Sequence, residues 1–178
     1  MKLYVVRHGQ TAWNAVRLLQ GSTDIPLNET GLRQAHETAE LLRGVPIDRV
    51  FLSPLSRAAE TGRIIAEGRD IPVITDDRLR ERGYGEFEGK PKDKESYARL
   101  WAYTKNYRFE SAENVRACFA RIYAFLDEIR TKYPDETILI ATHAGTAKVI
   151  HCYFCGMESD GWLADYVPAN AAPQLYEL

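Results

Sequence analysis

The sequence has neither a long apolar run nor a marked excess of charge of one sign. Its 178 residues carry 23 Lys and Arg against 25 Asp and Glu, a formal net charge of −2. This balance argues against nucleic acid or an anionic membrane as the main partner. No apolar run approaches the roughly 20 residues of a transmembrane helix. The apolar run near the first residue is also too short for a secretory signal peptide. We therefore expect a cytoplasmic protein.

Cysteine is also scarce. Cys118, Cys152 and Cys155 give an odd number, unlike the disulfide framework of a secreted protein. The C-x-x-C spacing beside His151 is compatible with a zinc or redox site, but no second pair of Cys or His matches it. The segment "KVIHCYFCG" is more typical of an apolar helix with small core cysteines. We expect neither a metal nor a cofactor.

The bulk composition is that of an ordinary globular protein, with 45% hydrophobic and 27% charged residues. A chain of this length buries enough surface to form a core without disulfides or metals. No internal repeat or low-complexity segment divides it. We expect a single domain over residues 1–178.

Short apolar or β-branched runs alternate with segments of helical periodicity. Strands are predicted at 2–7, 48–52, 71–75, 137–142 and 173–177. The clearest predicted helix runs from Ser111 to about Lys132. A second follows the N-cap Asn28 and ends at Gly44, a third follows a cap at Ser53, with Pro54 in its first turn, or at Ser56, and a fourth follows His143. This alternation predicts an α/β protein with helices on both faces of a sheet.

Residues 82–110 interrupt the alternation. The segment is rich in Gly, Tyr and mixed charge and predicts at most one short helix, around Ser96–Tyr103. A long excursion of this kind inside a compact domain is usually functional. We expect it to form a lid that determines substrate specificity.

Polar clusters stand at the boundaries between elements, at 7–14, 53–61 and 141–148, where each follows a strand and precedes a helix. The carboxyl ends of parallel strands meet at one edge of a sheet, where such folds bind ligands. Cationic side chains beside helix N-termini form an anion site, and guanidinium groups suit phosphate. The expected members of this site are Arg7, His8, Thr11, Asn14, Arg57 and His143.

Other interpretations remain open for single residues. His36 and His151 are expected to be structural or surface residues, and Trp13 a core residue. Arg57 is compatible with a solvated helix position and Asn14 with a simple helix cap. The phosphate interpretation is favoured because two histidines each precede a small residue at a strand end.

Four motifs in order, "RHGQTAWN", "SPLSRAAET", "RLRERGYGEFEG" and "THAG", resemble those of the histidine phosphatase superfamily, in its phosphoglycerate-mutase-like branch. The resemblance runs from Lys2 to about Leu178. It implies a three-layer α/β/α sandwich with a mostly parallel central sheet. It also implies catalysis without a metal.

The resemblance assigns roles to individual positions. His8 matches the nucleophile that becomes phosphorylated, and Arg7, Arg57 and His143 match the phosphate pocket, with Asn14 and Thr11 as additional donors. Glu81 matches the carboxyl group that protonates the leaving oxygen; Glu86 and Glu88 are nearby alternatives. Glu113 matches a position near the pocket rim and is equally compatible with capping the long helix.

The family contains phosphatases and mutases, and this sequence departs from the mutase pattern. It has no Arg-Arg dipeptide and no proline-rich insertion, it carries Gln10 where mutases usually have Glu, and no tail follows the last predicted strand. A mutase must shield its phosphoenzyme from water, whereas a phosphatase must admit water. We therefore expect a phosphomonoesterase acting on a small-molecule phosphate ester, with phosphoglycerate mutase as the alternative.

The substrate stays open among sugar phosphates, nucleotides, α-ribazole phosphate and phosphoglycerate, as does the oligomeric state. Aromatic residues at 97–109 indicate packing, or a substrate with a ring or apolar body if some of them line the pocket. A non-catalytic scaffold that only binds a phosphorylated ligand is a further alternative. It is disfavoured because every residue of the expected machinery is present.

Overall fold

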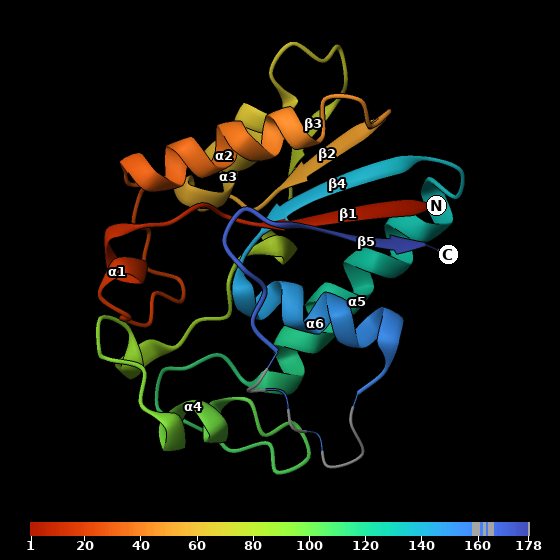
Figure 1. The fold of residues 1–178 in the computed structure, drawn as a ribbon. Helices are drawn as coiled ribbons and strands as arrows, with labels where there is room; N and C mark the ends of the chain where they lie inside the picture. The colour runs from red at the N-terminus through yellow and green to blue at the C-terminus, as the bar shows by residue number, and fades with distance from the viewer. Residues whose placement is uncertain (158–160, 162, 164–165, 178) are drawn as a thin grey trace.

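The fold is built on one mixed sheet. The computed structural model describes residues 1–157, 161, 163 and 166–177. Its five strands lie in the order β3-β2-β4-β1-β5 (Figure 1). They are β1 (Lys2–Arg7), β2 (Arg49–Leu52), β3 (Val73–Thr75), β4 (Thr137–Thr142) and β5 (Pro173–Glu177). Only β5 runs antiparallel to its neighbour, so the mostly parallel sheet predicted from the sequence is confirmed.

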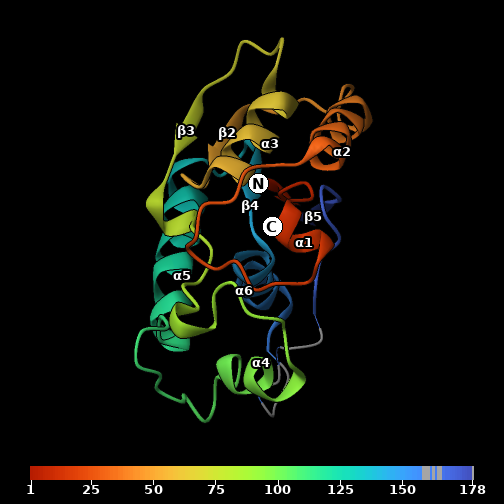
Figure 2. The same cartoon turned by 90° about the vertical axis from the view of Figure 1, so that its left-hand side faces the viewer.

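Helices cover both faces of this sheet. The α-helices are α1 (Ala12–Ala15), α2 (Glu29–Leu41), α3 (Ser56–Ala66), α4 (Lys94–Leu100), α5 (Val115–Lys132) and α6 (Ala144–Cys155), and 3₁₀ turns form at Asp77–Leu79 and Gly85–Phe87. The pair α2 and α3 lies over one face, and α5 and α6 lie over the other (Figures 1 and 2). The predicted three-layer arrangement is therefore confirmed.

The central strands β1, β2 and β4 are mostly apolar because both of their faces are buried, whereas the edge strands β3 and β5 are more exposed. Leu3 and Val5 belong to the core under α5 and α6, whereas Val6 belongs to the core under α2 and α3. In β4, Ile140 and Leu139 divide between the same two cores. Successive side chains of a strand point to opposite faces, so a strand covered on both sides needs apolar residues at every position.

Two helix starts differ from the predicted ones. Asn114 caps α5 by accepting hydrogen bonds from the amides of Arg116 and Ala117, so the helix begins at Val115 rather than at Ser111. Helix α3 begins at Ser56 without a side-chain cap. The amide and hydroxyl of Ser56 instead donate to the carboxylate of Asp24, at 2.9 and 2.7 Å, and this contact ties α3 to the loop before α2.

The excursion at 82–110 contains the one short helix that was predicted, but displaced, at Lys94–Leu100. Buried side chains of Leu100 and Trp101 attach it to the core. Trp13, which was expected in the core, is only half-buried. Within the described ranges, no helix is both long and apolar enough to cross a membrane.

Candidate active site

The register of the sheet brings the predicted motifs together. Arg7 pairs with Thr142 and Leu52 pairs with Ala141, so β1, β2 and β4 end at one level. The next residue of each strand continues the ladder: the amide of His8 donates to the carbonyl of Thr142 at 2.8 Å, and that of Ser53 to Ala141 at 3.0 Å. This alignment places His8 beside His143, with 5.2 Å between the ring centroids.

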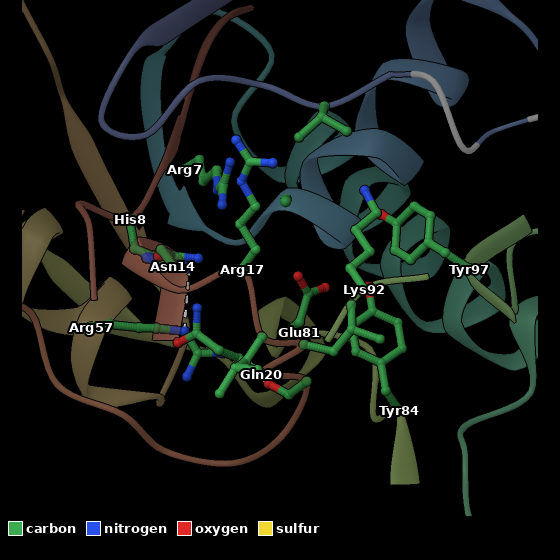
Figure 3. A pocket seen from close by; sticks show the side chains of 15 residues that line it. Arg7, His8, Asn14, Arg17, Gln20, Arg57, Glu81, Tyr84, Lys92 and Tyr97 are labelled. Carbon is green, nitrogen blue, oxygen red and sulfur yellow. Dashed lines mark hydrogen bonds between the residues drawn. The ribbon is translucent and has the colours of Figure 1, made fainter. Parts of the chain in front are cut away.

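A cavity of about 370 Å³ opens at this edge (Figure 3). A volume in this range holds a small-molecule ligand, and a few polar groups then fix its orientation. The residues that line it are Arg7, His8, Asn14, Arg17, Leu18, Leu19, Gln20, Gly21, Arg57, Glu81, Tyr84, Lys92, Tyr97, Ala144 and Val167.

The hydrogen bonds of His8 define its tautomer. Nδ1 lies 2.7 Å from the carbonyl oxygen of Gly9, which can only accept, so Nδ1 carries the proton. Nε2 therefore presents its lone pair and accepts a hydrogen bond of 3.3 Å from Nε of Arg57. Asn170 fixes the backbone by donating to the carbonyl of His8 at 2.7 Å. The nucleophilic atom of a neutral imidazole is thus the one on the side of Arg57.

The environment keeps His8 neutral. Burial lowers the pKa of His8 well below its ordinary value of 6.5, and the charges of Arg57 and Arg7 lower this pKa further. A buried imidazole next to two cations loses more by protonation than one in water. His8 therefore retains its lone pair throughout the neutral range.

Arg57 and Arg7 are held by backbone carbonyls rather than by carboxylates. Arg57 donates from Nη1 to Thr23 and from Nη2 to Gly21, each at 2.8 Å, and its side chain is fully buried. Arg7 donates from Nη1 to Pro168 at 2.8 Å, and its Nε is buried without a partner among the described residues. Neutral acceptors fix the two guanidinium groups without cancelling their charge. The positive charges of Arg7 and Arg57 therefore remain available to an anion.

His143 lies in the same buried cluster. Its Nε2 and the Ser53 hydroxyl are 2.7 Å apart, and its Nδ1 has no partner in the described part of the chain. Burial lowers the pKa of His143 well below its ordinary value, and the charge of Arg57 adds to the effect. His143 lies beside His8 but is not among the residues that line the cavity. In its neutral form, the unused ring nitrogen still has the capacity to donate one hydrogen bond.

Glu81 points into the cavity from the start of the excursion (Figure 3). Its Oε1 accepts hydrogen bonds from the amides of Arg82 and Thr146, at 2.9 and 3.2 Å, and its Oε2 accepts one from Gly145 at 2.9 Å. A carboxylate oxygen has two lone-pair sites. Oε2 therefore keeps one site for a ligand, while the first turn of α6 fixes the group.

Asn14 and Thr11 have different positions. Asn14 lines the cavity, as expected. Thr11 is fully buried as the cap of α1, and its hydroxyl bonds to Asn14 and Gln20, at 3.2 and 3.0 Å. Thr11 does not line the cavity and so can act on a ligand only through these neighbours.

The other carboxylates considered from the sequence are structural. Glu88 binds the amides and hydroxyls of Ser22 and Thr23. Burial opposes the ionised form of Glu88, but these hydrogen bonds prevail and lower its pKa. Glu86 is bound to Ser111 at 2.7 Å. Glu113 pairs with Arg121 at 2.7 Å and does not cap α5, and neither it nor Glu86 or Glu88 lines the cavity.

Four polar residues of the lining were not singled out from the sequence: Arg17, Gln20, Tyr84 and Lys92. Lys92 had been counted only in the mixed charge of the excursion, where no pattern distinguished it from its neighbours. Of the aromatic residues at 97–109, only Tyr97 lines the cavity. The side chain of Gln10 accepts a hydrogen bond of 3.0 Å from Asn28 and does not line the cavity. The replacement of the mutases' Glu by Gln at this position therefore affects the packing of the loop rather than the cavity wall.

No cluster of three or more metal-binding side chains occurs among the described residues. In the C-x-x-C pair, Cys152 is buried and Cys155 is exposed in the last turn of α6. His151 stacks on Tyr166, with 4.1 Å between centroids. His36 is exposed on α2, as expected.

Comparison with known sequences agrees with this geometry. Residues 3–175 match the sequence model of the histidine phosphatase superfamily, branch 1. The chain is 38% identical over 139 residues to PhoE of Bacillus subtilis, described as an uncharacterized phosphatase, and covers 69% of that protein. It is 37% identical over 149 residues to GpmB of Yersinia pestis, described as a probable phosphoglycerate mutase, again covering 69%. These matches span 78% and 80% of the present chain.

Solved structures show the same fold. YhfR of Bacillus stearothermophilus superposes with a TM-score of 0.88 at 29% identity, over 99% of this chain and 91% of the other. A mycobacterial glucosyl-3-phosphoglycerate phosphatase, solved with VO3, gives 0.86 at 26% identity, over 98% and 90%. Because the family model spans nearly the whole chain, the protein belongs to the histidine phosphatase superfamily, branch 1.

Proposed function

We propose that the protein is a metal-independent phosphomonoesterase that works through a phosphohistidine on His8. The observation that carries the proposal is the tautomer of this residue: Nδ1 donates to Gly9, so the lone pair of Nε2 lies at the cavity between two cations. The substrate class is a small-molecule phosphate ester, in keeping with the family.

In the first step Nε2 of His8 attacks phosphorus, a P–N bond forms, and the P–O bond to the alcohol breaks. Arg7 and Arg57 stabilise the charge on the equatorial oxygens, and catalysis of this type consists mainly of positioning and electrostatic stabilisation. Asn14 and Nδ1 of His143 add neutral donors. The proton of protonated Glu81 passes to the departing alcohol oxygen.

In the second step the same groups work in reverse. Ionised Glu81 takes a proton from a water molecule, whose oxygen attacks phosphorus and breaks the P–N bond. Inorganic phosphate leaves, and neutral His8 and protonated Glu81 are regenerated. Since Oε2 of Glu81 has one lone-pair site unused by the protein, a single atom serves both steps.

Phosphoglycerate mutase remains the second candidate because GpmB carries that description. A mutase returns the phosphoryl group to a substrate hydroxyl instead of to water. The lack of an Arg-Arg pair and of a proline-rich insertion favours hydrolysis. Both candidates require the same phosphoenzyme, so the fate of this intermediate distinguishes them.

The test is release of phosphate from p-nitrophenyl phosphate in excess EDTA, for wild type, His8→Ala and His36→Ala. We expect turnover in wild type and in the His36 control, which replaces an exposed histidine on α2, and none in His8→Ala. A phosphorylated form of the wild type, labile in acid, should be trapped by rapid quenching. A panel of sugar, nucleotide and glycerate phosphates ranks the substrates.

Other outcomes would change the proposal. Exchange between 3- and 2-phosphoglycerate without phosphate release would establish the mutase. Binding of phosphate esters with neither reaction would indicate a scaffold. Activity that EDTA abolishes would contradict catalysis without a metal, and turnover retained in His8→Ala would exclude His8 as the nucleophile.

A further inference from the structure

Arg17 lines the cavity, and the phosphate-binding scheme above makes no use of it. Its side chain is exposed and extends toward Arg7 (Figure 3). The guanidinium group makes no hydrogen bond and no ion pair with any residue that the structure describes. An arginine without a protein partner at the wall of a substrate cavity is available to a ligand.

The backbone, rather than the side chain, fixes Arg17 in this place. Its φ is 60°, a left-handed conformation that few residues other than glycine adopt. The amide of Arg17 donates to Asn14 at 3.1 Å, its carbonyl accepts from Lys92 at 3.2 Å, and Leu18 donates to Trp13 at 2.9 Å. The loop is therefore held in a strained conformation that presents a cation to the cavity.

The charges of the lining exceed what a phosphate monoester neutralises. Arg7, Arg17, Arg57 and Lys92 oppose one carboxyl group, Glu81, so the surplus is three positive charges when Glu81 is ionised and four when it carries the proton of the proposed first step. A phosphate monoester supplies at most two negative charges. At least one positive charge therefore remains for a further anionic group on the same ligand.

We infer that Arg17 binds a second anionic group, a carboxylate or a second phosphate, carried by the alcohol half of the substrate. Arg7 and Arg57 engage the phosphate next to His8. Lys92 lies over the ring of Tyr97, with 3.6 Å between its Nζ and the ring centroid, so Arg17 is the cation left for the rest of the ligand. A guanidinium group pairs with either anion through two parallel hydrogen bonds. This inference rests on the proposed phosphatase function and narrows its substrates to phosphate esters of anionic alcohols.

The test compares ligands that differ by one anionic group. In the first pair, 3-phosphoglycerate carries a carboxylate where glycerol 3-phosphate has a hydroxymethyl group. In the second pair, glucose 1,6-bisphosphate carries a phosphate that glucose 6-phosphate lacks. Dissociation constants are measured by calorimetry in the His8→Ala protein, where no turnover consumes the ligand, and kcat/KM is measured with His8 intact.

The variants are Arg17→Gln, Arg17→Lys and, as a matched control, Arg63→Gln, which removes an exposed arginine on α3 outside the lining. We expect a preference for the anionic member of at least one pair, of about tenfold or more for a charge-assisted contact. Arg17→Gln should abolish it, Arg17→Lys should keep part of it, and Arg63→Gln should keep all of it. The responding pair identifies carboxylate or phosphate.

Equal binding of both members of both pairs would overturn the inference, as would a preference that survives in Arg17→Gln. An equal loss for both members of a pair would also overturn it, because Arg17 would then act on the shared phosphate. If binding shows the expected preference but the wild type neither hydrolyses nor exchanges phosphate, the phosphatase proposal fails and the specificity of Arg17 stands.

Discussion

The amide of Gly145 donates a hydrogen bond of 2.9 Å to Oε2 of Glu81, across 64 positions of the chain. The contact is close enough to exclude a side chain: a Cβ added at Gly145 would lie 2.4 Å from Oε1 of Glu81 and 2.7 Å from the ring of Trp101. The first turn of α6 and the carboxylate are therefore fitted to each other.

We expect Gly145→Ala to reduce kcat at least tenfold, because the new methyl group must displace the Glu81 carboxylate. Gly44→Ala is the matched control, since a Cβ there would have nothing within 4 Å. Steady-state kinetics and thermal unfolding of both variants check this. A Gly145→Ala protein with the activity of the wild type would show that the position of Glu81 is not critical.

We expect the effect of Glu81→Gln to depend on the leaving group. An alkyl alcohol must be protonated as it leaves, so kcat should fall by about 10²–10⁴ with alkyl phosphates. With p-nitrophenyl phosphate, whose phenolate is a stable anion, the first step should lose much less. The measurement is the ratio of single-turnover rates for the two substrates. Misfolding would lower both rates together and leave this ratio unchanged.

Glu86→Gln serves as the control for that experiment. Glu86 is partly exposed to solvent, accepts hydrogen bonds from Ser111 and from the amide of Glu110, and lies outside the cavity. We expect its replacement to leave both rates and their ratio unaltered. A change of the ratio in Glu86→Gln, with none in Glu81→Gln, would identify Glu86 rather than Glu81 as the general acid.

We expect Arg121 to act as a positioning residue for Glu81. Its guanidinium donates to the carbonyls of Arg78 and Arg80, at 2.6 and 3.0 Å, and pairs with Glu113. Arg121→Met should lower kcat while leaving KM for the phosphate ester nearly unchanged. It should also reduce the free energy of unfolding by about 1–3 kcal/mol, because the partly buried carbonyl of Arg78 and the carboxylate of Glu113 lose their donor.

The ion pair between Arg49 and Glu136 provides the comparison. It is similarly shielded and has two hydrogen bonds, at 2.9 and 3.0 Å, but lies at the opposite end of the strands. Arg49→Met should reduce stability without lowering kcat. If both variants changed kcat equally, the loss would reflect general destabilisation.

We expect stability to fall as the pH drops below about 6.5. The folded-state pKa of His8 and of His143 lies well below 6.5, so in this range the unfolded chain binds protons that the folded protein does not. Each histidine should then contribute a slope of about 1.4 kcal/mol per pH unit to the free energy of unfolding. Above the unfolded-state pKa, this dependence disappears.

Chemical denaturation between pH 5 and 7.5 measures this dependence. His8→Asn should remove one histidine's share of the slope. Leu42→Ala, which deletes a buried apolar side chain, should lower stability by the same amount at every pH. An unchanged slope in His8→Asn would show that His8 is protonated as readily in the folded protein as in the unfolded chain.

The sequence predicted the sheet well because its central strands β1, β2 and β4 are covered on both faces, so that their apolar runs are nearly unbroken. It also predicted that Arg7, His8, Arg57 and His143 meet at one edge, because each stands at or just after the carboxyl end of a predicted parallel strand. It could not separate Asn14 from Thr11, since the two lie three residues apart in one motif and only the turn of α1 directs Asn14 toward the cavity. Arg17 was missed because its orientation depends on a left-handed backbone that no local pattern indicates.

Helix α3 was predicted with a serine cap because Ser53 and Ser56 are good capping residues at suitable positions. The tertiary structure uses them otherwise: Ser53 contacts His143, and Ser56 contacts Asp24. Local propensity is overridden where the same hydroxyl has a long-range partner. The same holds for Glu113, whose partner Arg121 lies two turns further along α5.

The last strand and the loop before it hold the first strand's functional end. Pro168 accepts from Arg7, Asn170 donates to the carbonyl of His8, and the amide of Ala171 donates to the carbonyl of Arg7 at 2.8 Å. During translation, His8 therefore precedes by more than 160 residues the segment that completes its surroundings. A nascent chain carries His8 throughout the synthesis of these residues, and the proposed site should form only once residue 171 has emerged.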